Sequence, residues 1–301
     1  MTPEDEGRIA AEQFRRKHKL GVQPLGDLIT IIEESTGFDV AVLDVGPDEH
    51  GLTIRDPEHD SVIIGAARTR NPMRQRSTLA HEPGHVVFAD WTEATPRDWS
   101  EPTPRDERAR AFARHLLVPS EGLQEFMNDR PAPGQADLSA VVQRFVVSPQ
   151  LAAVALHDNG YIDAARRDEW MAVSTPQLAT RYGWTDHYEI LQDDPNRRRA
   201  PQRLLARAIS GYEAGVVSAQ TIATLREIRL AEAEHELEAA GITQAPPAVT
   251  WVKPEDLPHV QVDLDELDAD LAPPSTGNDD QFPDQPSKLQ ATPKRRSSVT
   301  Q

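Results

Sequence analysis

The 301-residue sequence contains no cysteine. Disulfide bonds, thiol nucleophiles, iron–sulfur clusters and cysteine-bound zinc sites are therefore excluded. Any metal site must be built from histidine, aspartate or glutamate side chains. Long apolar runs are also missing, because no segment reaches the roughly 18 apolar residues that a membrane helix needs.

Positive charge is scarce. The chain has 32 lysines and arginines against 49 aspartates and glutamates, which gives a formal net charge of -17. This balance argues against binding of nucleic acid or an anionic membrane by the chain as a whole. The N-terminal residues are acidic and lack the basic and then apolar pattern of a signal peptide, so we expect a cytoplasmic protein.

The first 90 residues combine helical and strand-like patterns. Apolar residues at helical spacing predict two helices before Gly37 and a third that follows Asn71-Pro72 and runs to about residue 89. Between them lie three short β-like runs separated by Pro and Gly, at residues 39–45, 52–55 and 61–66. These runs predict a small, mostly antiparallel sheet. A further helix is expected over residues 106–117.

Residues 138–159 have the pattern of a helix-turn-helix. Ser148 is suited to cap the second helix and Gly160 to end it. The second helix carries no lysine or arginine, whereas DNA binding draws most of its affinity from neutralising phosphates with these residues. We therefore expect a packing or substrate-recognition module, and DNA binding is not expected.

The remainder divides into a helical region of unassigned role and a polar tail. Nine of the 25 prolines fall in the last 59 residues, together with Ser, Asp and Gln, which predicts disorder. The predicted organisation is a first domain of helices and strands at 1–130, the helix-turn-helix module at 131–165, a helical region at 166–242 and a disordered tail at 243–301.

Residues 81–85 read HEPGH, an HExxH motif. On a helix, residues i and i+4 share a face, so His81 and His85 can bind one metal ion. Glu82 can then accept a proton from a metal-bound water as a general base. Zinc fits two imidazole nitrogens, one carboxylate oxygen and an open water position, so we predict Zn²⁺ as the cofactor.

The third ligand must come from a carboxylate after the motif, and the candidates are Asp90, Glu93, Asp98, Glu101, Asp106 and Glu107. On a continuing helix, Asp90 would point about 140° away from His85, and the loop residues have no rigid element to hold them. Asp106 lies beside the apolar face of its helix and is the predicted ligand. Glu107, rotated by about 100°, remains its competitor. His115 lies on the opposite side of that helix and is not expected to bind metal.

Two linked motifs resemble the ImmA/IrrE family of metallopeptidases. RSTLAHEPGH at residues 76–85 is similar to the family's R-x-T-L-A-H-E-L-G-H, and DERARAFARHLLVP at 106–119 to its E-x-x-A-x-x-F-A-x-x-L-L-x-P. The resemblance covers roughly residues 5–165. It implies an α+β fold with a zincin-like catalytic domain, followed here by an all-α region. It also implies a peptidase whose protein substrate is often a helix-turn-helix repressor, cleaved to relieve repression.

The chain departs from the family pattern at two positions. Asp106 stands where the family has Glu, so its carboxylate must approach the metal more closely. Pro83 stands where the family has an aliphatic residue, at a cost of about 3 kcal/mol or more and with a kink expected between the histidines. Pro83 therefore supports an alternative, in which a catalytically degenerate peptidase-like domain acts as a non-catalytic, protein-binding regulatory module.

Overall fold

The computed structural model describes residues 1–45, 51–90, 103–128 and 132–245. Contacts between Cα atoms divide the chain into Met1–Pro247 and Ala248–Gln301, and the second unit lies outside the described residues. Most of the predicted disordered tail at 243–301, from residue 246 onward, also lies outside the described residues. Within the described part, the predicted α+β class with a following all-α region is confirmed.

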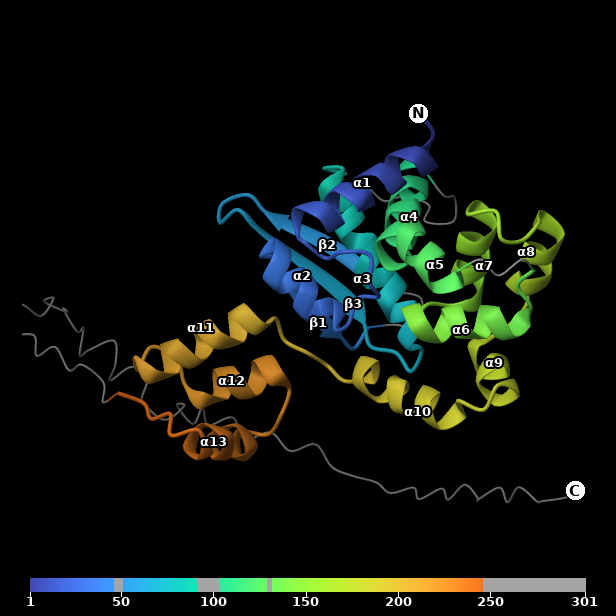
Figure 1. Ribbon diagram of the computed structural model, residues 1–301. Coiled ribbons are helices and arrows are strands. Elements are labelled where there is room, and N and C mark those ends of the chain that lie inside the picture. The colour runs from blue at the N-terminus through green and yellow to red at the C-terminus, as the bar shows by residue number, and fades with distance from the viewer. Residues whose placement is uncertain (46–50, 91–102, 129–131, 246–301) are drawn as a thin grey trace, which may run out of the picture. The chain divides into compact units, whose positions relative to one another are not determined.

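The elements follow one another as Figure 1 labels them. They are α1 (Pro3–Lys17), α2 (Leu28–Thr36), β1 (Asp39–Leu43), β2 (Gly51–Asp56), β3 (Ser61–Ala67), α3 (Pro72–Val87), α4 (Pro104–Leu117), α5 (Ser120–Met127), α6 (Gln135–Phe145), α7 (Pro149–Asp158), α8 (Ala164–Met171), α9 (Thr175–Arg181), α10 (Thr185–Asp193), the 3₁₀ helix η1 (Asp194–Asn196), α11 (Gln202–Glu213), α12 (Ala219–Arg226) and α13 (Leu230–Ala239).

The three strands form one sheet in the order β1-β3-β2. The sheet is mixed, where a mostly antiparallel one was predicted: β2 runs antiparallel to β3, and β1 runs parallel to it. Because β2 and β3 form a hairpin, β1 joins the far side of β3. The central strand β3 is mostly buried, whereas β2 is largely exposed and lies at the edge. The outer edge of β1 is covered by an antiparallel bridge between Val42 and Arg199.

Helix α4 packs against both α1 and α3, and this packing brings the two halves of the family motif together. The rings of Phe14 and Phe112 meet edge to face between α1 and α4, with centroids 5.6 Å apart. Gly84 lies where α3 approaches α4, and a Cβ added there would stand 3.2 Å from Ala109 Cα. This spacing is tighter than ordinary contact, so the motif glycine permits the close approach of the two helices.

One hydrophobic core extends from α1 to α10 and crosses the boundaries predicted at residues 130 and 165. The predicted helix-turn-helix is present as α6 and α7, bent by 108° to one another. The side chain of Ser148 caps α7 at the backbone nitrogen of Leu151. In α7, which is described throughout, Asp158 is the one exposed residue. The second helix is therefore a packing element of the core.

Helices α11, α12 and α13 pack together around a smaller second core (Figure 1). Its buried members are Ala219, Ile222, Ala223, Ala233 and Leu237. Arg199, before α11, hydrogen-bonds to the backbone of Val42 in β1. In the first turn of α11, Arg203 Nε lies 3.2 Å from Asp39 Oδ1 of the same strand.

No single helix among the described residues is both long and apolar enough to cross a bilayer. Helices α6 and α7 satisfy this length and hydropathy only as a bent pair. Both helices are also part of the buried core.

Candidate metal centre

Helix α3 carries the HExxH motif without interruption. It begins at the cap residue Asn71, whose side chain accepts a hydrogen bond from the backbone nitrogen of Arg74 at 3.1 Å, and continues to Val87. Pro83 is buried inside the helix. Proline has no N–H to donate to the carbonyl of Leu79, yet the helix does not break there. The two histidines remain on one face, with Nε2 of His81 and Nε2 of His85 3.0 Å apart.

The predicted ligands His81, His85 and Asp106 lie together. One ligand atom from each forms a group in which all atoms are within 4.8 Å of one another. Nε2 of His85 lies 3.9 Å from Oδ1 of Asp106. Zinc bonds of about 2.0–2.1 Å in a tetrahedron place ligand atoms about 3.3–3.4 Å apart. Two imidazoles and one carboxylate at these separations fit zinc with small adjustments.

The two carboxylate oxygens of Asp106 face different partners, and one of them faces the histidines. Oδ2 accepts hydrogen bonds from the backbone nitrogen and Oγ1 of Thr103, at 2.9 and 2.8 Å, in a capping box at the start of α4. Oδ1 is left on the side of His85. The close approach of α4 to α3 at Gly84 compensates for an aspartate side chain that is one methylene shorter than glutamate.

The other candidates are placed elsewhere. Glu107 is exposed on α4. Asp90 lies beside the other ring nitrogen of His85, Nδ1, at 3.4 Å. Glu93, Asp98 and Glu101 lie outside the described residues. His115 is buried against α1, with Nε2 2.8 Å from Glu4 Oε1, and does not join the group.

Burial and hydrogen bonds set the protonation of the cluster. Burial, assisted by the neighbouring His85, lowers the pKa of His81 to about 4, so this imidazole is neutral at pH 7 with a free lone pair. Burial acts to raise the pKa of Asp106, but hydrogen bonds from Thr103 and the nearby histidines outweigh it and lower that pKa. At neutral pH His81 and Asp106 are therefore in the forms that bind metal.

Glu82 is buried beside the cluster and is held by the edge strand. Oγ1 of Thr53 on β2 donates a hydrogen bond to Oε2 of Glu82 at 2.7 Å. A Cβ added to Gly51 would stand 2.6 Å from Oε1, so glycine is required where β2 passes this carboxylate. Burial raises the pKa of Glu82, and the hydrogen bond from Thr53 opposes that shift. Sequence reasoning missed Thr53 and Gly51, whose alternation along a short strand was the only available signal.

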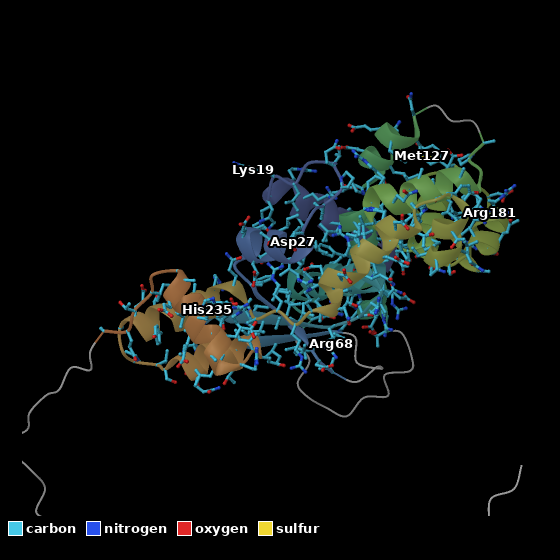
Figure 2. The ribbon with its side chains drawn as sticks, turned by 90° about the horizontal axis from the view of Figure 1, so that it is seen from below. Lys19, Asp27, Arg68, Met127, Arg181 and His235 are labelled. Atoms are coloured by element: carbon cyan, nitrogen blue, oxygen red, sulfur yellow. The ribbon has the colours of Figure 1, made fainter. Side chains whose placement is uncertain are left out.

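The first residue of the motif, Arg76, has a structural role. Its Nη1 and Nη2 donate to the carbonyls of Gly26 and Leu25, each at 2.7 Å. These two residues directly precede Asp27, which is labelled in Figure 2. Burial lowers the pKa of Arg76 to about 10, which leaves it charged at neutral pH. Arg76 therefore fixes the segment that leads into α2 against the HExxH helix.

Comparison with known proteins identifies the domain. Residues 34–157 match the family described as the IrrE N-terminal-like domain, a peptidase family. The matched segment runs from the end of α2 into α7 and contains the whole cluster. The match confirms the resemblance to the ImmA/IrrE family over residues 34–157.

A solved structure of a Mycobacterium tuberculosis transcriptional regulator is also similar to the chain. It is 17% identical with a TM-score of 0.34, and the match covers 51% of this chain and 47% of that one. Less than half of that protein's length is thus matched. The comparison with curated proteins finds no significant match.

Proposed function

We propose that this chain, whose residues 34–157 form an IrrE N-terminal-like domain, is a zinc-dependent endopeptidase that cleaves a helix-turn-helix repressor in the cytoplasm. The observation that carries the proposal is the convergence of His81, His85 and Asp106 within 4.8 Å. Glu82, the remaining functional residue of the motif, is buried directly beside this group.

The residues divide the chemistry between them. His81, His85 and Asp106 would hold the ion, which when bound polarises a peptide carbonyl and lowers the pKa of a bound water. Glu82 Oε1 would take a proton from the attacking water, whose oxygen would bond to the carbonyl carbon. Glu82 then passes the proton to the departing amide nitrogen as the C–N bond breaks. The raised pKa of Glu82 favours the first of these transfers, in which its carboxylate accepts the proton.

The position of the edge strand β2 is an argument for a protein substrate. Among the described residues, β2 pairs with β3 on one side and forms the other edge of the sheet. An extended peptide can add to such an edge as a further strand. Since Thr53 on β2 contacts Glu82, a peptide paired there would lie beside the general base. The net charge of -17 favours encounter with a basic partner, a category that includes many DNA-binding repressors.

The test combines metal analysis with cleavage. Wild-type protein and Glu82→Gln are purified, loaded with zinc and incubated with candidate helix-turn-helix repressors. We expect one equivalent of zinc in both proteins and cleavage by wild type alone. Absence of zinc from loaded wild type would overturn the proposal.

Pro83 favours one alternative, a non-catalytic regulatory module. In that case wild type binds a repressor without cutting it, and Pro83→Leu restores cleavage by returning the missing backbone donor. Cleavage by wild type, lost in Glu82→Gln, excludes this alternative.

A further inference from the structure

Asp90 lies on the side of His85 that faces away from the cluster. Its Oδ2 is 3.4 Å from Nδ1 of His85, while Nε2 of the same ring faces His81 and Asp106. The Asp90 side chain is only 4% exposed. We propose that Asp90 is a positioning residue that fixes the ring of His85 for metal binding. This inference rests on the proposed metal-dependent function.

The backbone after α3 is shaped to bring Asp90 to this place. The helix ends at Val87, and Ala89 adopts a left-handed conformation with φ of 52°. The backbone nitrogen of Asp90 donates to the carbonyl of His85 at 2.9 Å, which folds the chain back over the helix end. Non-glycine residues rarely adopt positive φ and persist there only when their surroundings hold them. This turn explains why Asp90 does not point away from His85, as it would on a continuing helix.

Arg108 of α4 holds the Asp90 carboxylate from the opposite side. Its Nη2 pairs with Oδ1 of Asp90, and its Nε donates to Oδ2 at 3.4 Å. Arg108 itself lies over the ring of Phe88, 4.6 Å from the centroid, and 3.5 Å from Glu6 of α1. The buried charge of Asp90 is therefore paired, and its orientation is fixed by a residue outside the metal cluster.

This arrangement has a definite consequence for His85. A carboxylate that accepts a hydrogen bond from Nδ1–H fixes the tautomer in which Nε2 carries the free lone pair. It also fixes the ring orientation and raises the basicity of the coordinating nitrogen. Loss of such an outer partner lowers metal affinity about 10–100-fold.

The experiment compares zinc affinity in Asp90→Asn, Asp56→Asn and wild type by competition with a chelating dye. Asp56 is the matched control, because its Oδ2 lies 2.7 Å from Nδ1 of His59, a carboxylate–histidine pair outside the cluster. We expect affinity to fall about 10–100-fold in Asp90→Asn and to stay at the wild-type value in Asp56→Asn. In a His85→Ala background, Asp90→Asn should cause no further loss, because Asp90 acts through His85.

The outcomes separate the two proposals. Wild type that binds zinc with an affinity unchanged in Asp90→Asn overturns the role of Asp90 and leaves the metal site intact. Wild type that binds no zinc overturns both. Circular dichroism checks the fold of each variant. If Asp90→Asn does not fold, NMR of zinc-loaded wild type decides instead: a slowly exchanging Nδ1 proton on His85 is expected, and rapid exchange contradicts the inference.

Discussion

Thr53 Oγ1 donates a hydrogen bond of 2.7 Å to Oε2 of Glu82 and so joins the edge strand to the HExxH helix. Removing this donor in Thr53→Val leaves a buried carboxylate with one partner fewer. Hydrogen bonds to charged groups contribute about 1.5–3 kcal/mol, so we expect kcat to fall roughly 10–100-fold. Zinc content should not change. Thr53→Ser keeps the hydroxyl and should retain most of the activity, and equal loss in both variants would contradict this role.

Gly51 is expected to tolerate no side chain. A Cβ there would lie 2.6 Å from Glu82 Oε1 and 2.5 Å from Thr78 Cγ2, closer than real Cβ contacts. Gly51→Ala should therefore displace the general base and reduce kcat at least about 10-fold, while the zinc affinity stays near wild type. Gly134→Ala is the control, because nothing lies within 4 Å of an added Cβ. Full activity in Gly51→Ala would show that β2 does not hold Glu82.

Pro83 should lower the stability of the domain. Alanine at this position restores the N–H for the carbonyl of Leu79 and removes the ring from the helix interior. We expect Pro83→Ala to raise the free energy of unfolding by up to about 3 kcal/mol, measured by urea denaturation. A decrease would mean that burial of the proline ring outweighs the missing hydrogen bond.

The lowered pKa of Glu4 predicts that the free energy of unfolding depends on pH. The hydrogen bond from His115, followed by the pairing with Arg114, lowers the pKa of Glu4 to about 2 against burial. A carboxylate with a lowered folded-state pKa adds stability that is complete above its unfolded value and is lost as pH falls toward 2. Unfolding free energies between pH 6 and about 2.5 should therefore fall more steeply for wild type than for Glu4→Gln. If the unfolding free energies of wild type and Glu4→Gln fall with the same slope, the interactions of Glu4 with His115 and Arg114 do not contribute to the pH dependence.

The features of the site and fold that could be predicted from the sequence depend on local chemistry. The shared face of His81 and His85 follows from helical spacing, and the place of Asp106 follows from the apolar face of its own helix. In the structure their ligand atoms lie within 4.8 Å of one another, and their role as metal ligands stays a prediction. The helix pair α6 and α7 was likewise evident from the cap at Ser148.

The features that could not be predicted depend on packing between segments that are far apart in the sequence. Strand β1 pairs in parallel with β3 although β2 lies between them in the sequence, and no local pattern specifies this order. Thr53 contacts Glu82 across 29 residues, and Arg76 reaches Gly26 across 50. Helix α3 continues through Pro83 to Val87. Asp90 was misplaced because the helix ends two residues earlier than expected.

Zinc stoichiometry in wild type, Asp106→Ala and Glu107→Ala shows whether the metal site exists and whether Asp106 is its third ligand. Each protein is loaded with zinc, dialysed and analysed for bound metal, with Thr103→Ala as a control that removes the helix cap but keeps the carboxylate. We expect one equivalent of zinc per chain in wild type, Glu107→Ala and Thr103→Ala, and loss of zinc in Asp106→Ala. Zinc retained by Asp106→Ala and lost from Glu107→Ala, or absent from wild type, would contradict it.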